Sequence, residues 1–119
     1  MFAGTFTALI TPFRDGSLDH EAFKSLIDRQ VVAGITGIVP VGTTGESPTL
    51  DSNEHLEVIS AAVEYADKRL LVVAGSGANS TNEAIHLTQA SEKAGADASL
   101  QVCPYYNKPS QEGLYQHYK

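Results

Sequence analysis

Cysteine and positive charge are scarce in this sequence of 119 residues, and tryptophan is absent. The one cysteine, Cys103, excludes an internal disulfide and a cysteine-based zinc site, and its place in an apolar run predicts a buried, reduced thiol. Only 8 Lys and Arg stand against 14 Asp and Glu, which leaves a net charge of −6. Because this balance provides no basic surface for a phosphate backbone, we expect no nucleic-acid partner.

Long apolar runs are missing as well. No run approaches the ~20 residues needed to cross a bilayer, and residues 1–13 carry no basic segment ahead of an apolar one. We therefore expect a cytoplasmic protein without a membrane partner.

The sequence also lacks the motifs that hold nucleotides and metal ions. Residues 42–47 (GTTGES) lack the lysine of a P-loop, and residues 75–80 (GSGANS) lack the third glycine of a dinucleotide fingerprint. A calcium loop starting at Asp51 fails because Leu56 stands where a glycine is needed. The histidines have no ligand spacing, and surface roles are expected for His20, His55, His86 and His117. We expect no cofactor and no metal.

What is present is an alternation of short β-rich runs with longer stretches of helical period. Apolar runs predict strands over residues 6–11, 37–41, 70–74 and 99–103. Helical spacing follows Asp19, Asp51 and Ser80, and a last helix begins at Gly113.

Local signals mark the helix ends. Capping boxes are expected where an acidic residue follows the N-cap by three positions, at Asp51 with Glu54 and at Ser80 with Glu83. Left-handed helix ends are expected at Gly34 and Gly95.

Strands that are apolar at consecutive positions are typical of a parallel sheet covered by helices, so the predicted fold class is α/β. At about 30 residues per βα unit the chain holds about four units, whereas a closed barrel of eight needs about 250 residues. We predict that residues 1–119 form one partial domain, the N-terminal half of a (βα)₈ TIM barrel, because an open doubly wound sheet usually has about five strands or more. The chain stops at Lys119 in mid-helix, so we expect that the second half barrel is missing.

Both α/β architectures place their sites in the loops after the strands. In residues 42–47 the glycines permit close backbone approach, and the hydroxyls of Thr43 and Thr44 with nearby amides can hold a carboxylate; the alternative is an ordinary glycine-rich turn. Tyr105 and Tyr106 follow the fourth strand, where a phenol can relay protons if a threonine hydroxyl supplies the next link. The alternative is that both tyrosines pack at a subunit boundary.

Residues 37–47 (GIVPVGTTGES), followed by Glu54, resemble the signature of the class I pyruvate aldolase family that contains dihydrodipicolinate synthase and N-acetylneuraminate lyase. Residues 2–13 (FAGTFTALITPF) and 104–119 (PYYNKPSQEGLYQHYK) resemble the dihydrodipicolinate synthase members in particular, so the resemblance runs the whole length of the chain. It implies a (βα)₈ barrel with a small C-terminal helical domain, of which this chain has the first four strands.

The resemblance implies a lyase that condenses pyruvate with L-aspartate-4-semialdehyde on the diaminopimelate route to lysine, through a Schiff base with a protein lysine and without a cofactor. Thr44 would hold the pyruvate carboxylate through its hydroxyl and amide, in a substrate-binding loop that includes Gly42 and Gly45. Thr43 would belong to the proton relay, and Tyr106 would reach in from a neighbouring subunit to complete it. The implied assembly is a homotetramer, a dimer of dimers.

The Schiff-base lysine of the family would lie beyond Lys119, and Lys108 is no substitute because nothing near it in sequence would desolvate its amine. We therefore expect the 119-residue chain by itself to be inactive. Two alternatives stay open. One is cleavage of N-acetylneuraminate or a 2-keto-3-deoxy-sugar acid, and the other is a non-catalytic half barrel that binds partners through its sheet edges.

A lysine feedback site is also implied, at a subunit interface. The matching positions are Ser47, His55, Asn79, Glu83 and Tyr105. Each has a structural alternative, for example that Glu83 only completes a capping box.

Overall fold

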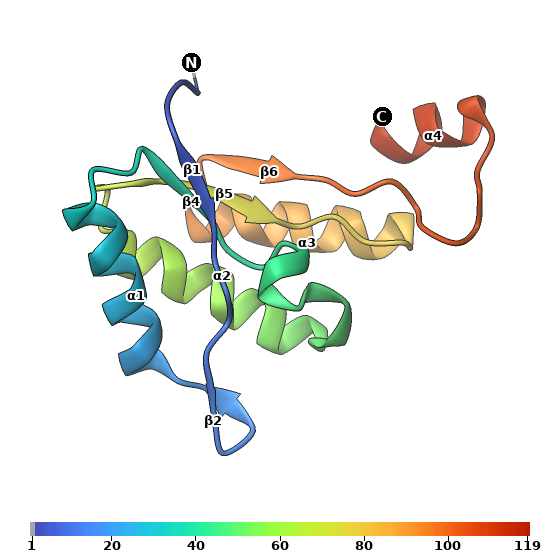
Figure 1. Cartoon of the computed structure of the whole chain (residues 1–119). Helices are drawn as coiled ribbons and strands as arrows, with labels where there is room; N and C mark the ends of the chain where they lie inside the picture. The colour runs from blue at the N-terminus through green and yellow to red at the C-terminus, as the bar shows by residue number, and fades with distance from the viewer. Residues whose placement is uncertain (1) are drawn as a thin grey trace.

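The computed structural model describes residues 2–119, in which a four-stranded parallel sheet carries its helices on one side (Figure 1). The strands lie side by side in chain order, β1 (Phe6–Ala8), β4 (Gly37–Val39), β5 (Leu71–Gly75) and β6 (Ala98–Leu100). The helices between them are α1 (His20–Val32), α2 (Ser52–Ala66) and α3 (Thr81–Ala94). This alternation confirms the predicted α/β class with its parallel sheet.

Three of the four strands are shorter than the apolar runs predicted. β1 ends at Ala8 rather than at residue 11, because its register with β4 covers only three pairs, from Phe6 with Gly37 to Ala8 with Val39. Beyond β1 the chain forms a hairpin that the periodicity did not reveal, β2 (Phe13–Arg14) with β3 (Ser17–Leu18). The turn has positive φ at Asp15 (53°) and Gly16 (81°), as the Asp-Gly pair favours in a two-residue hairpin loop.

The helix ends follow the local signals with one exception. The capping box of Asp51 and Glu54 is present, and Gly34 and Gly95 have φ of 72° and 99°. The capping box predicted at Ser80 is wrong, because the Ser80 side chain makes no cap hydrogen bond to α3. The last helix, α4 (Gln111–Tyr118), begins before the predicted Gly113 and is capped by Ser110, whose hydroxyl accepts from Gly113 N at 3.1 Å.

The hydrophobic core lies between the sheet and the helices. α1 and α2 share it with the sheet, and its fully enclosed side chains include Phe23, Ile27, Ile38, Val58, Ile59, Val72 and Ala74. On α2 the buried residues are His55, Val58, Ile59, Ala61, Ala62 and Ala66, whereas Leu56 and Val63 are half-buried. On α3 the buried residues are Ala84, Leu87 and Ser91.

Side chains near the end of β6 are exposed. Leu100 and Val102 are 49% and 38% exposed, and Cys103 is exposed as well. The prediction of a buried thiol at Cys103 is therefore wrong. The reason is that α1, α2 and α3 cover one side of the sheet only (Figure 1).

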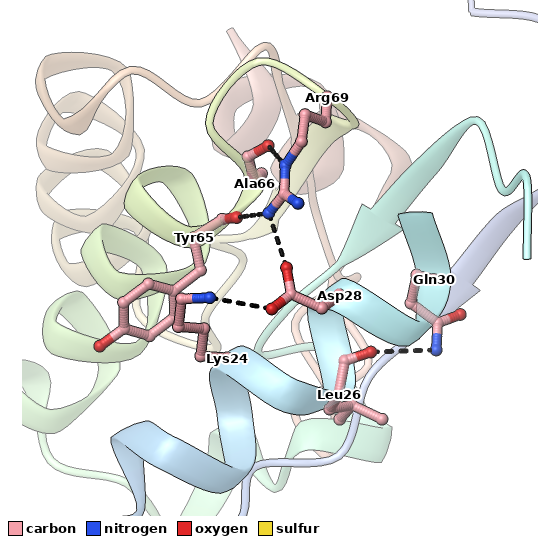
Figure 2. A network of polar contacts seen from close by, with 7 residues as sticks. All are labelled: Lys24, Leu26, Asp28, Gln30, Tyr65, Ala66 and Arg69. Carbon is pink, nitrogen blue, oxygen red and sulfur yellow. Dashed lines mark hydrogen bonds and ion pairs between the residues drawn. The ribbon is translucent and has the colours of Figure 1, made fainter. Parts of the chain in front are cut away.

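Ionic contacts join α1 to the end of α2 (Figure 2). The Asp28 carboxylate accepts hydrogen bonds from Lys24 Nζ at 2.9 Å and from Arg69 Nη2 at 2.8 Å. These two hydrogen bonds hold the pKa of the Asp28 carboxyl below its usual value. The same guanidinium donates to the carbonyl oxygens of Tyr65 at 2.6 Å and Ala66 at 3.2 Å. Arg69 thus satisfies two of the open C-terminal carbonyls of α2 and also binds Asp28 on α1.

Candidate functional site

The loops that follow β4, β5 and β6 meet at one edge of the sheet, where the carboxyl ends of parallel strands place binding groups. Glycines allow this meeting. A Cβ added at Gly75 would lie 2.2 Å from Val41 O, and one at Gly77 would lie 2.4 Å from Val102 N. The backbones therefore touch directly at this edge, which makes the Gly-Ser-Gly sequence at the end of β5 a packing feature.

The loop after β4 presents two exposed hydroxyls. Thr43 begins the short 3₁₀ helix η1 (Thr43–Gly45), and both Thr43 and Thr44 are exposed. Within residues 2–119 the backbone N–H groups of Thr43 and Thr44 have no acceptor, since the first bond of this turn runs from Gly45 N to Gly42 O at 2.9 Å. Two hydroxyls and two unpaired amides can together hold a carboxylate.

Contacts on its buried side hold this loop in place. Gly45 is buried, and its carbonyl accepts from the buried Thr11 hydroxyl at 2.7 Å. Val41, the last residue before the loop, is 1% exposed and has φ of 54°. A β-branched residue in that region is a strained outlier, which persists only where the surrounding structure enforces it.

A pocket of about 530 Å³ opens between the three loops. Four of the five side chains considered for a lysine site line it, and they come from four different segments of the chain: Ser47, His55, Glu83 and Tyr105. Thr43 and Gly42 also line it, so the pocket lies next to the threonine loop. A larger, shallow hollow of about 670 Å³ lies along α1, away from the strand ends, beside the already paired Lys24 and Asp28.

His55 is a core histidine and not the surface residue that its lack of ligand spacing suggested. It is 4% exposed, and its Nε2 lies 2.6 Å from Gly75 O. Burial lowers the pKa of the imidazole below 6.5, against the opposing effects of the Gly75 carbonyl and the Glu83 carboxylate. The ring is therefore neutral at pH 7 and donates from Nε2 to that carbonyl.

The loop after β6 carries the two tyrosines in different settings. Tyr105 is half-exposed on the pocket, whereas Tyr106 is 97% exposed. Tyr106 makes no hydrogen bond to Thr43 within the part of the chain that the structure describes. One chain therefore does not assemble the relay, and Lys108 likewise is an exposed loop residue.

Asn79 holds that loop instead of lining the pocket. Its Nδ2 donates to Tyr105 O at 2.5 Å, and its Oδ1 accepts from Asn107 Nδ2 at 3.0 Å. Glu83 is free to face the pocket because Ser80 and Glu83 form no capping box. The sequence pattern had no signal for the supporting roles of Thr11 and Asn107, since each depends on a partner 28 or more residues away.

No cluster of three or more His, Cys, Asp or Glu side chains that could hold a metal ion occurs among residues 2–119. In that same range no helix is both long enough and apolar enough to cross a membrane.

A family model described as the dihydrodipicolinate synthetase family matches residues 1–119. The 4-hydroxy-tetrahydrodipicolinate synthase of Bradyrhizobium diazoefficiens is 62% identical over 118 residues, which are 99% of this chain and 40% of that relative. The chain thus spans about 40% of the length of the curated relatives that it matches.

Solved structures agree with the sheet and its helices. The 4-hydroxy-tetrahydrodipicolinate synthase of Methylacidiphilum fumariolicum SolV superposes with a TM-score of 0.97 at 52% identity, over 99% of this chain and 39% of that one. A chloride-inhibited dihydrodipicolinate synthase from Acinetobacter baumannii, complexed with pyruvate, superposes with a TM-score of 0.92 at 51% identity, over 97% of this chain and 40% of that one. The dihydrodipicolinate synthase from Cyanidioschyzon merolae with lysine bound superposes with a TM-score of 0.93 at 41% identity, over 98% of this chain and 40% of that one. The match confirms that this α/β sheet corresponds to about 40% of such a TIM-barrel chain.

Proposed function

The chain belongs to the dihydrodipicolinate synthetase family, and on this premise we propose that it forms the pyruvate-binding part of a 4-hydroxy-tetrahydrodipicolinate synthase. The observation that carries the proposal is the threonine loop. Thr43 and Thr44 offer exposed hydroxyls and unpaired amides at the carboxyl end of β4, in a chain 62% identical to such a synthase.

In this proposal the two threonines do different work. Thr44, supported by the backbone at Gly42 and Gly45, holds the carboxylate of pyruvate, which places the carbonyl carbon for attack by a lysine amine. The Thr43 hydroxyl passes protons while the Schiff base forms and while the enamine attacks the aldehyde of L-aspartate-4-semialdehyde. Tyr106 supplies the next hydroxyl in a neighbouring copy of the chain.

An oligomer is part of the proposal because of where Tyr106 lies. A phenol that is 97% exposed on its own chain is available to a neighbouring subunit, and the family resemblance implies a dimer of dimers. We place this homo-oligomer in the cytoplasm. The family resemblance puts the Schiff-base lysine outside residues 1–119, and Lys108 lies exposed to water in a loop, so the chain alone is inactive.

A chimera tests the proposed activity. Residues 1–119 replace the matching segment of the Bradyrhizobium diazoefficiens synthase, and the condensation of pyruvate with L-aspartate-4-semialdehyde is followed. We expect turnover within about tenfold of the unsubstituted relative, because every group assigned here is then in place. The same graft into an N-acetylneuraminate lyase is the matched control.

Three outcomes would contradict the proposal. A folded synthase chimera without turnover would show that the threonine loop does not serve this reaction and would favour the non-catalytic half barrel. Sugar-acid cleavage by the lyase chimera alone would favour the aldolase alternative. A pyruvate adduct trapped by borohydride on the 119-residue chain would contradict its inactivity.

We further propose that the pocket between the three loops binds L-lysine as a feedback inhibitor. Glu83 would pair with a ligand ammonium group, while Ser47, His55 and Tyr105 line the cavity and Asn79 borders it through Tyr105. The lysine-bound Cyanidioschyzon merolae relative supports this reading. Glu83→Gln should weaken inhibition of the chimera by at least about tenfold, with Glu64→Gln on the exposed face of α2 as control.

A further inference from the structure

The segment that carries Tyr106 has an unfavourable backbone. Tyr106 has φ of 70° and Lys108 has φ of 48°, so two bulky residues on either side of Asn107 adopt the left-handed conformation that glycine favours. Side-chain packing does not enforce this shape, since Tyr106 is 97% exposed and Lys108 is exposed as well. Something else must hold the backbone.

Two hydrogen bonds from Asn79 flank Tyr106. On one side of Tyr106, Asn79 Nδ2 donates to the Tyr105 carbonyl oxygen at 2.5 Å. On the other side, Asn107 Nδ2 donates to Asn79 Oδ1 at 3.0 Å. Asn79 lies in the loop after β5, which is anchored by the close backbone approach of Gly77 to Val102. The amide of Asn79 therefore uses both its ends to fix the residues before and after the tyrosine.

We propose that Asn79 and Asn107 form an amide clamp whose purpose is to position Tyr106. The clamp holds the left-handed backbone, and that backbone turns the Tyr106 phenol away from its own chain. Asn79 and Asn107 are positioning residues, since they act through Tyr106 and touch no reacting atom. The functional half of this proposal rests on the proposed role of Tyr106 in the proton relay.

The clamp also gives Asn107 a role that differs from that of the pocket residues. Asn107 does not line the pocket, so its loss should leave ligand binding there unchanged. It lies on a different loop from Thr44, so its loss should also leave the grip on pyruvate unchanged. Only the placement of Tyr106 should suffer.

Native-state proteolysis of the 119-residue chain tests the clamp without any activity. Chymotrypsin binds the chain around its cleavage site in an extended conformation, so it should cut after Tyr105 and Tyr106 faster when the left-handed backbone opens, and mass spectrometry identifies those cuts. Because a lost hydrogen bond raises the open population, Asn107→Ala and Asn79→Ala should each be cut about three- to tenfold faster. Asn82→Ala, which truncates an exposed asparagine in the first turn of α3, is the matched control and should be cut at the parental rate.

A double variant sharpens the result. If the two asparagines act as one clamp, Asn79→Ala with Asn107→Ala should accelerate cleavage by less than the product of the single effects. Rates equal to that of the parent chain, or accelerations that multiply fully, would overturn the clamp.

Kinetics in the synthase chimera test the positioning role. Asn107→Ala should lower kcat about tenfold and leave the KM for pyruvate and the concentration of lysine that gives half inhibition unchanged. An unchanged kcat together with faster cleavage would refute the positioning role, because the clamp would then stabilise the loop without affecting the reaction. If the unsubstituted chimera has no turnover, the proposed function is wrong, and so is the positioning role that rests on it. The proteolysis still decides whether the clamp exists.

Discussion

A methyl group added at Gly75 should displace the backbone of the candidate site. A Cβ there would lie 2.2 Å from Val41 O and 2.7 Å from Gly42 N, so the loop after β4 must retreat by roughly 1 Å to reach van der Waals contact. That loop is tied to β5 by the hydrogen bond from Gly75 N to Pro40 O at 3.0 Å. The retreat breaks this buried bond.

The expected loss of stability follows from these two effects. Overpacking costs about 1–3 kcal/mol, and a buried amide left without its partner costs about 1–3 kcal/mol. We expect Gly75→Ala to lower the free energy of unfolding by about 3 kcal/mol, measured by urea unfolding followed by circular dichroism. In the synthase chimera the same variant should lose activity, because the displaced backbone carries Thr43.

Two other glycines provide matched controls for this prediction. Gly34 has φ of 72° with nothing within 4 Å of an added Cβ, so Gly34→Ala should lose only the conformational term, about 1 kcal/mol. Gly42 has φ of −76° and its nearest neighbour would be 3.9 Å away, so Gly42→Ala should change stability by less than about 0.5 kcal/mol. Equal stability of the Gly75 and Gly42 variants would refute the steric argument.

Three further predictions follow from the structure. In the synthase chimera Thr43→Val should lower kcat about a hundredfold by removing a relay hydroxyl, while Thr44→Val should mainly raise the KM for pyruvate; a common effect on both constants would contradict the division of roles. Burial lowers the pKa of His55 in the folded chain below 6.5, its value in the unfolded chain. At a pH between these two pKa values the unfolded chain therefore binds more protons than the folded one. The free energy of unfolding should therefore fall as pH drops below 6.5 and level off above it, and His55→Asn should flatten this dependence. Phe23 is fully buried, so Phe23→Ala should lower the free energy of unfolding by about 3–5 kcal/mol, whereas Val32→Ala at the exposed end of α1 should leave the denaturation midpoint unchanged.

Much of the fold could be predicted from sequence because its signals are local. The apolar period placed α1, α2 and α3, and the capping box at Asp51 and the glycines at positions 34 and 95 marked helix ends that the structure has. Strand limits were harder to predict. A strand ends where its neighbour stops pairing, and the three-pair register of β1 with β4 is not encoded in residues 6–11 by themselves.

Sequence by itself determined which loops carry the candidate site, since parallel strands must end on one edge and the Thr43–Thr44 pair follows the second predicted strand. Only the tertiary structure decided which side chains share a pocket there. His55 became a buried neutral ring because α2 packs against the end of β5, and Asn79 became a clamp because the loops after β5 and β6 meet across Gly77. Such contacts join residues 20 to 28 positions apart, and local period carries no information about which distant backbone atom will lie within hydrogen-bonding distance.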